Sequence, residues 1–442
     1  MAVEPYRRLL ALPGVRSLLL VGLLARVPTT AVSITLTLHV VDRSGLNLDD
    51  FVLAGLLATA STVGTAIGSP LAGRFVDSHG LRPVLAVTTL AQLAFWSTAW
   101  MMPFPLLLAA AIPAGLLSLP VFSVIRQCLA ALVPVEQQRV GFSLDSILVE
   151  LSYMVGPALA VAGVSLLGSA PTMGIVAAGL VASGTTLLVL NPPVRSAEEL
   201  KEPAGRIPRR QWLTPRLLGL LGTVMAATFI LSATELSLVA TMKQGHASEW
   251  LGLAIALWCF YSLVGGFVYG MMPRGLSPLV LIGAMGVLTI PIGLVDGHWL
   301  WLLLAMLPAG VLCAPALSST IETMTRWVPA GARGEAMGLH GTALLVGVGV
   351  ASPVAGAIID GPGPDWAFAA AGLVSVVMVL IALPFWRRGS DSSVVDPVSE
   401  PGSDRDPDPG SDPVSDPDRV SDPDPASGSD PGSVERSVPV TT

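Results

Sequence analysis

The chain has 442 residues, of which 52% are hydrophobic and only 12% are charged. Soluble globular proteins carry about 25% charged residues, so this composition excludes an ordinary soluble domain and indicates a protein that crosses a membrane several times. Its three cysteines, Cys128, Cys259 and Cys313, are scattered in apolar runs without paired spacing. This usage predicts neither a disulfide framework nor a metal site.

The net charge of −7 is unevenly distributed along the chain. Residues 389–442 hold thirteen acidic and three basic residues, a net charge of −10, so the preceding 388 residues carry +3. The repeated Ser-Asp-Pro and Asp-Pro-Asp units of this tail, with few apolar residues, predict a disordered acidic Asp/Pro/Ser-rich segment. An acidic docking segment is the alternative interpretation.

Twelve segments are long and apolar enough to cross about 30 Å of hydrocarbon, which takes about 20 helical residues. We predict them at 17–39, 51–72, 83–102, 105–130, 141–166, 171–190, 216–240, 250–272, 278–295, 299–325, 337–359 and 366–386. The pattern predicts an all-α integral membrane protein with twelve transmembrane helices.

The basic residues of the connections fall on one side of this arrangement, which we call the arginine-rich side. That side has Arg7, Arg8, Arg16, Arg74, Arg82, Arg139, Arg195, Lys201, Arg206, Arg209, Arg210, Arg274, Arg333, Arg387 and Arg388, whereas the other side has Arg43 and Lys243. The positive-inside rule predicts that the arginine-rich side is cytoplasmic. We therefore expect a multi-pass protein of the plasma or inner membrane with both termini in the cytoplasm.

Residues 191–215, which we call the connector, form the longest and most basic internal connection. The connector separates six predicted helices in residues 1–190, the first half, from six in residues 216–388, the second half. Shifting the numbering by 195, which we call the repeat offset, superposes Gly80 on Gly275, Pro83 on Pro278, Pro113 on Pro308, Gly115 on Gly310, Pro120 on Pro315, Ser123 on Ser318 and Pro134 on Pro329. Agreement at residues that determine the backbone indicates an internal duplication.

A short charged segment, 73–83, lies between the second and third predicted helices. We expect a tight turn there, with Gly80 supplying backbone freedom and Pro83 at the first position of the next helix. Charged residues of this turn, among them Asp77 and Arg82, then lie beside helix ends, where they can pair with one another or cap a neighbouring helix. The spacing Gly73-x-x-x-Asp77-x-x-Gly80-x-Arg82 resembles the loop between the second and third helices of the major facilitator superfamily (MFS) of transporters.

This resemblance covers residues 1–388 and implies the MFS fold, two parallel-repeat bundles of six helices with a substrate cavity between them near the middle of the membrane. The sequence departs from the family at Ser78 and Leu81, where basic residues are usual. Met272 stands at the position of Asp77 in the second-half copy.

Ionisable residues inside predicted helices cost a few kcal/mol to insert, so each one is a candidate functional residue. Arg26 lies roughly 15 Å into the first helix. It either pairs with a carboxylate from another helix or contacts a substrate or counter-ion in the cavity. Arg126 and Asp145 are predicted to form an ion pair close to Asp77 and Arg82, and the resemblance also implies a link between the loop motif and charges on the fourth helix.

Glu150 lies near the middle of the fifth predicted helix with no cation on its own helix. One hypothesis is that it pairs with Arg26 or Arg126. The other is that this desolvated carboxyl group binds and releases the coupling proton.

Gly156 and Pro157 follow on the same helix and resemble the Gly-Pro-x-x-Gly motif of antiporting drug exporters in this superfamily, with Ala160 in place of the second glycine. The alternative interpretation is a kink of small residues that lets helices pack closely.

Four further polar residues lie in the second half. Glu322 and Arg326 are four residues apart with the acid first, which favours an ion pair within one helix. Glu235 and His340 could join a proton route, although a structural role at a helix interface is the alternative.

The sequence has no nucleotide-binding loop of the Gly-x-x-x-x-Gly-Lys-Ser/Thr type, and no catalytic or metal cluster stands out. We therefore expect no enzyme activity and no cofactor, with a proton gradient as the energy source. The favoured function is secondary active export of a small, fairly apolar compound by proton antiport. A sugar or metabolite symporter or uniporter, and a polytopic enzyme or a non-transporting receptor on the same scaffold, are the alternatives. The expected partners are a small-molecule substrate, protons and the lipid bilayer, without nucleic acid, and we expect a monomer.

Overall fold

The structure is a computed structural model that describes residues 4–44, 48–196, 198–199, 207–247, 250–295 and 299–388. The side chains of residues 41–52 and 387–388 are not included in this description. The predicted acidic tail, 389–442, and the predicted basic residues Lys201 and Arg206 lie outside the described residues.

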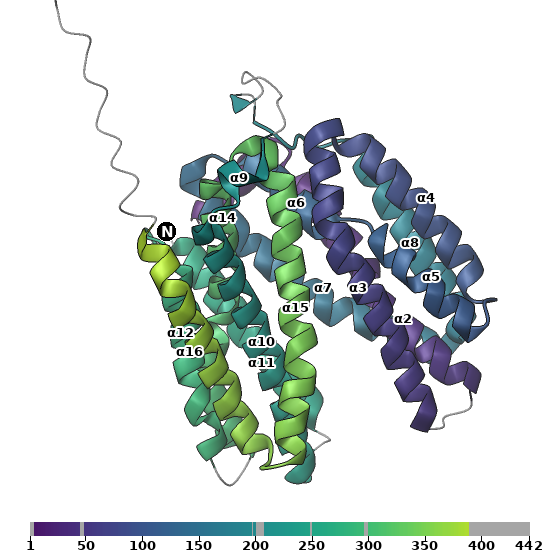
Figure 1. Cartoon of the computed structure of the whole chain (residues 1–442), viewed down its shortest axis with the longest axis vertical. Coiled ribbons are helices and arrows are strands. Elements are labelled where there is room, and N and C mark those ends of the chain that lie inside the picture. Colours follow the sequence, from purple (N-terminus) through teal and green to yellow (C-terminus); the bar gives the residue numbers. More distant parts are fainter. Residues whose placement is uncertain are drawn as a thin grey trace, which may run out of the picture. The chain divides into compact units, whose positions relative to one another are not determined.

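The described chain is almost entirely helical (Figure 1). The first half contains α1 (Glu4–Ala11), α2 (Val15–Ser44), α3 (Leu48–His79), α4 (Leu81–Ala99), α5 (Phe104–Leu116), α6 (Val121–Leu132), η1 (Val135–Gln137), α7 (Gln138–Leu167) and α8 (Ser169–Leu190). The connector contains α9 (Arg209–Trp212). The second half contains α10 (Pro215–Gln244), α11 (Leu251–Met271), α12 (Pro278–Thr289), η4 (Ile290–Leu294), α13 (Trp299–Val311), α14 (Cys313–Trp327), η5 (Ala330–Ala332), α15 (Arg333–Asp360) and α16 (Pro364–Arg388).

The predicted all-α membrane fold is confirmed. In the described part of the chain, nine helical segments are long and apolar enough to cross a membrane. A shorter apolar segment, formed by α12 and η4, adds to these. Helix α3 covers the predicted segment 51–72, and α4 covers the predicted segment 83–102 as far as Ala99, so the helices are consistent with twelve crossings.

The bounds of the helices follow the repeat offset found in the sequence. Helix α13 begins and ends one repeat offset after α5, and η5 is related to η1 in the same way at both of its ends. The start of α15 likewise corresponds to the start of α7. The duplication therefore extends from matching glycines and prolines to matching secondary structure.

The predicted turn at 73–83 is wrong over most of its length, because α3 continues as a helix to His79. The break falls at Gly80 alone, whose φ of 83° lies in the region that glycine adopts readily. Pro83 is the third residue of α4 rather than the first. It is tolerated there because the first four N–H groups of a helix have no partner within the helix.

Two predicted single helices, 105–130 and 299–325, are each interrupted. The first is divided into α5 and α6, and the second into α13 and α14 with Leu312 between them. Pro120 precedes α6 and Pro315 lies in the first turn of α14. Since proline has no N–H to continue the preceding helix, both interruptions follow from the local sequence.

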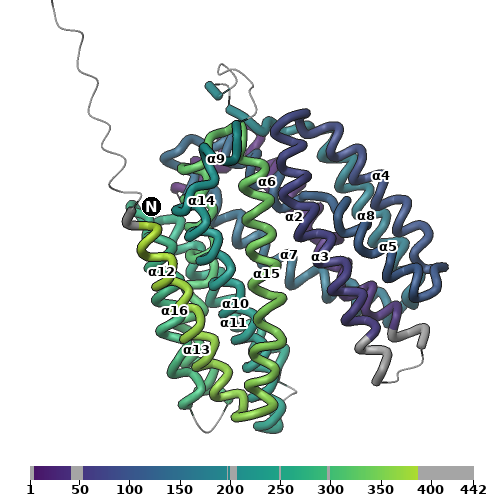
Figure 2. The backbone as a smooth tube through the Cα atoms, in the orientation of Figure 1, coloured from purple at the N-terminus to yellow at the C-terminus, as the bar shows by residue number. Residues whose placement is uncertain are grey.

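The helices pack mainly within their own half of the chain, as Figure 2 shows. In the first half, α2 packs on α7 and α8, and α3 packs on α5. In the second half, α10 packs on α15 and α16, and α12 packs on α16. Contacts between the halves are made by α3 with α15 and by α7 with α11 and α14.

One buried apolar cluster contains residues of both halves, including Cys128 and Leu129 of α6 with Ile321 and Met324 of α14. These residues lie toward the arginine-rich ends of their helices. Two further clusters each belong to one half. Apolar burial therefore joins the halves on the arginine-rich side.

Candidate functional site

Asp77, near the end of α3, caps the first turn of α15. Its Oδ1 accepts the backbone N–H of Gly334 at 2.9 Å, and its Oδ2 accepts that of Glu335 at 2.9 Å. Gln127 of α6 donates a third hydrogen bond to Oδ1 at 3.0 Å. Of the two alternatives for Asp77, the structure therefore shows the helix cap. This cap links the first half to the second.

The two helices approach closely at this cap because glycines lie at the contact. A Cβ atom added to Gly73 would collide with the carbonyl oxygen of Gly334, and one added to Gly334 would meet Asp77 Oδ1 at 2.5 Å.

Arg82 has no hydrogen bond or ion pair among the residues described, and its side chain is exposed. The predicted proximity of Arg82 to an acidic partner is therefore not observed.

Burial raises the pKa of Asp77 from 3.8 to about 6, against the opposing effect of the hydrogen bonds from Glu335, Gly334 and Gln127 and of the nearby charge of Arg195. Asp77 lies beyond the apolar segment 51–72, at the arginine-rich end of α3. Its charge state consequently changes in the physiological pH range rather than near pH 4.

An ion cluster at the start of α7 and the end of α14 makes a second contact between the halves. Arg139 of α7 donates to the carbonyl oxygen of Met272 at 2.9 Å and pairs with Glu322 of α14 at 3.3 Å. Glu322 also pairs with Arg326 at 2.6 Å, as predicted from their spacing. Arg139, the cation that reaches across from the first half, is not among the site residues predicted from the sequence.

The connector is bound to the same turn of α15 by two ion pairs. Glu199 pairs with Arg333 at 2.9 Å, and Arg209 pairs with Glu335. Arg333 and Glu335 flank Gly334, so the connector and Asp77 hold consecutive residues of α15. No local pattern in the sequence indicates these two ion pairs.

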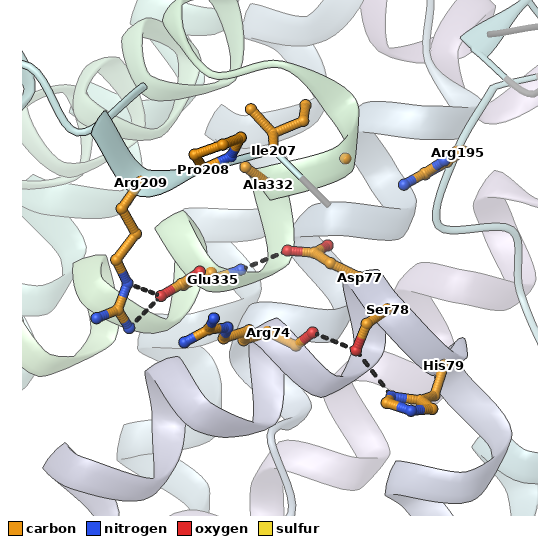
Figure 3. A pocket seen from close by; sticks show the side chains of 11 residues that line it. Arg74, Asp77, Ser78, His79, Arg195, Ile207, Pro208, Arg209, Ala332 and Glu335 are labelled. Carbon is orange, nitrogen blue, oxygen red and sulfur yellow. Dashed lines mark hydrogen bonds and ion pairs between the residues drawn. The ribbon is translucent and has the colours of Figure 1, made fainter. Parts of the chain in front are cut away.

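A cavity of about 300 Å³ lies where the end of α3, the connector and the start of α15 meet (Figure 3). Figure 3 shows Glu335 between Arg209 and the carboxylate of Asp77, with Arg195 on the far side of Asp77. Arg74 and His79 also line the cavity. Both carboxylates in it are already occupied by hydrogen bonds.

Deeper in the first half, Arg26 and Arg126 share one carboxylate. Arg26 Nη2 lies 2.6 Å from Asp145 Oδ1, and Arg126 Nε lies 3.3 Å from Oδ2. Arg26 is fully buried and stands over the ring of Phe122, 5.2 Å from its centroid. The predicted ion pair of Arg126 with Asp145 is present. Arg26 binds the same carboxylate, so of the two alternatives for Arg26 the ion pair is the one observed.

Glu150, further along α7, has no arginine partner in the described structure, so its predicted pairing with Arg26 or Arg126 is wrong. Both arginines are already bound to Asp145. Oε1 of Glu150 instead accepts a hydrogen bond from Ser262 of α11, in the second half. Oε2 has no hydrogen-bond partner among the described residues.

Glu235 of α10 and Glu150 of α7 both lie within electrostatic reach of Cys259 on α11. Glu235 is exposed and no partner is seen for it in the described part of the chain. The remaining candidate, His340, is buried and bonded through Nε2 to Thr320 at 2.9 Å.

Gly156 is a point of close helix packing. A Cβ atom there would collide with Thr30 Oγ1 and approach the carbonyl oxygen of Val27 at 2.6 Å. In the second half, a Cβ atom on Gly347 would collide with Thr228 in the corresponding crossing of α15 and α10. The close-packing interpretation of Gly156 and the following Pro157 has this geometric support.

Comparisons with known proteins agree with this architecture. Residues 18–296 and 247–419 match the family model described as Major Facilitator Superfamily. The chloramphenicol resistance protein of Streptomyces lividans is 30% identical over 347 residues, which are 75% of this chain and 86% of that protein. An outward-facing bacterial homologue of the iron transporter ferroportin is 17% identical, with a TM-score of 0.66 over 85% of this chain and 99% of that chain. The proton:xylose symporter XylE is 15% identical, with a TM-score of 0.63 over 84% and 96%.

The fold and its duplicated helices define a multi-pass helical membrane protein. The family match and the resistance protein relative then make the assignment specific: the chain belongs to the major facilitator superfamily and is a transporter.

Proposed function

We propose that this transporter exports a small, fairly apolar organic compound in exchange for protons. The observation that carries the proposal is the state of Glu150. The other deep acid of the first half, Asp145, is neutralised by two arginines. Glu150 lies where α7 meets α11, and its Oε2 has no partner among the residues that the structure describes. A carboxyl group with this freedom, at the junction of two moving halves, is suited to bind and release a proton during the cycle.

The arrangement of the halves supports alternating access, in which the halves close on one side of the membrane and then on the other. Asp77 with α15, and Arg139 with Glu322, tie the halves together on the arginine-rich side. If that side is cytoplasmic, as the positive-inside rule indicates, the structure represents the arrangement that is closed to the cytoplasm.

Export rather than import is supported by the relative that confers chloramphenicol resistance. A membrane transporter can give resistance to a compound that acts inside the cell by lowering the internal concentration of that compound. Chloramphenicol is therefore the first compound to test, followed by other uncharged or weakly polar compounds of similar size.

The proposal is tested by measuring accumulation of labelled chloramphenicol and of a compound panel in cells that express the protein. Expressing cells should accumulate at least one compound less than cells with an empty vector, and a proton uncoupler should remove the difference. Glu150→Gln should not lower accumulation, whereas Glu136→Gln, which neutralises an exposed acid of η1, is its matched control and should export like the wild-type protein. Equal accumulation of every compound with and without the protein would contradict export.

A further inference from the structure

Ser262 occupies a position where three helices meet. Its side chain is 1% exposed on α11. The hydroxyl group accepts the backbone N–H of Ala314 on α14 at 3.1 Å and donates to Oε1 of Glu150 on α7. One side chain therefore links a carboxylate of the first half to two helices of the second.

The direction of these hydrogen bonds follows from the available groups. Ala314 lies in the first turn of α14, where N–H groups have no acceptor within the helix, so Ser262 Oγ must act as its acceptor. A hydroxyl group has one hydrogen, which is then free to donate to Glu150. A hydrogen bond donated to a carboxylate favours its charged form.

The surrounding packing holds Ser262 in place. One turn further along α11, a Cβ atom on Gly266 would lie 2.9 Å from Ala314 Cβ and 3.3 Å from Ile147 of α7. Because no side chain stands at Gly266, α11 packs closely against both α7 and α14 there. This packing keeps the backbone of Ser262 close to Glu150 and Ala314.

Other charged and titratable groups around Glu150 are placed differently. Cys259 on α11 and Cys313 on α14 are within electrostatic reach of Glu150. Glu235 on α10 reaches Cys259 as well. On the first-half side, the arginines of α2 and α6 are bound to Asp145. Among these described groups, Ser262 alone donates a hydrogen bond to Glu150.

We propose that Ser262 is a positioning residue that sets the proton affinity of Glu150 and ties the charge of Glu150 to the contact between α7 and α11. This inference rests on the proposed function for its role in transport. In the charged state Glu150 accepts the hydrogen bond and holds α7 against α11. Protonation weakens the hydrogen bond and so favours separation of the two helices.

The test is an infrared titration of the purified protein, which follows the protonated carboxyl band that disappears in Glu150→Gln. In Ser262→Ala, loss of the donor should move the midpoint of this band to higher pH by about one unit. Ser262→Thr keeps a hydroxyl group and should restore the wild-type midpoint. Ser237→Ala is the matched control, because Ser237 is a buried serine of α10 that donates only to Ala233 of its own helix, at 2.7 Å.

Ser262→Ala also removes the acceptor of Ala314, so its folded yield is measured in parallel. If that variant does not fold, Ser262→Cys, with a weaker donor, should give a smaller shift in the same direction. An unchanged midpoint in the folded variant would overturn the inference.

Proton-driven transport by the same samples separates this inference from the proposed function. A midpoint that shifts in a protein whose transport ignores the proton gradient would refute antiport while supporting Ser262. An unshifted midpoint in a protein that transports by antiport would refute Ser262 alone.

Discussion

Asp77 accepts the backbone N–H of Gly334 at 2.9 Å, and a hydrogen bond of another kind joins the equivalent pair of positions in the duplicated chain. The equivalents of Asp77 and Gly334 are Met272 and Arg139. There the guanidinium of Arg139 donates to the backbone carbonyl oxygen of Met272, also at 2.9 Å. The second copy of the loop motif has lost its carboxylate, yet the contact between the end of one helix and the start of another in the opposite half is retained.

The first prediction concerns the cap at α15. Asp77→Asn replaces one of two acceptor oxygens by a donor, so Gly334 or Glu335 loses its hydrogen bond. A helix cap contributes about 1 kcal/mol, so amide exchange at the residue that loses its acceptor should become about fivefold faster. Transport should weaken while membrane insertion stays unchanged, because the balance between arrangements shifts. Ser78→Ala, which removes a hydroxyl group bonded within its own helix, should affect neither; normal exchange and transport in Asp77→Asn would exclude Asp77 from the mechanism.

The second prediction concerns pH. Burial raises the pKa of Asp77 to about 6 in this arrangement, and separation of the halves should return it toward its ordinary value near 4. The closed arrangement therefore binds the proton more tightly. Its extra stability is complete below pH 4 and is lost as the pH rises through 6.

Distances between spin labels at Phe75 and Leu276, two exposed positions in opposite halves, measure this effect in a cysteine-free background. The closed population should grow as the pH falls from 7 to 5 and should respond less in Asp77→Asn. If the wild-type protein and Asp77→Asn respond equally to pH, a group other than Asp77 causes the effect.

The third prediction concerns the connector. Arg209→Glu places two like charges together at Glu335, whereas the double exchange Arg209→Glu with Glu335→Arg restores an ion pair. Arg209 is half exposed, so the expected change is small, about twofold in the rate of proteolytic cleavage of the connector. Arg210→Glu is the control, since Arg210 makes no ion pair in the described structure and is also exposed. Equal cleavage of the wild-type protein, Arg209→Glu and the double exchange would show that the ion pair does not hold the connector.

The fourth prediction orders two changes in the buried charge cluster. Asp145→Asn leaves Arg26 and Arg126 without their shared anion and should cost about 3–5 kcal/mol of stability. Arg26→Met should cost less, because Asp145 keeps Arg126 at 3.3 Å. Thermal unfolding in detergent gives the order, and an equal or reversed order would mean that the cluster is not organised around Asp145.

Much of this architecture could be predicted because it depends on local and periodic signals. Apolar runs of about 20 residues identify helices that cross a membrane. The duplication follows from the repeat offset between matching glycines and prolines, which needs no helix bounds. Glu322 and Arg326 could be paired because a spacing of four places them on one helix face.

Other features depend on contacts between distant segments and left no local signal. The charged residues and glycines of 73–83 suggested a turn, but residues 73–79 continue the helix α3, which packs closely on α15 at Gly73. Ser262 is one serine in an apolar segment, and its importance arises only from Glu150 and Ala314 beside it. Arg126 and Asp145 could be paired because both lie toward the same end of their predicted helices. That Arg26 binds Asp145 and not Glu150 depends on how the helices pack, which the sequence does not show.

The most direct test of proton antiport uses proteoliposomes with the exported compound at equal concentration on both sides and an imposed pH gradient. In antiport, protons moving to the alkaline side should drive the compound toward the acidic side. Wild-type protein should produce this accumulation, and Glu150→Gln should bind the compound but not accumulate it, because its neutral side chain resembles the protonated state and cannot release a proton. Accumulation on the alkaline side, no response to the gradient, or wild-type accumulation by Glu150→Gln would contradict proton antiport through Glu150.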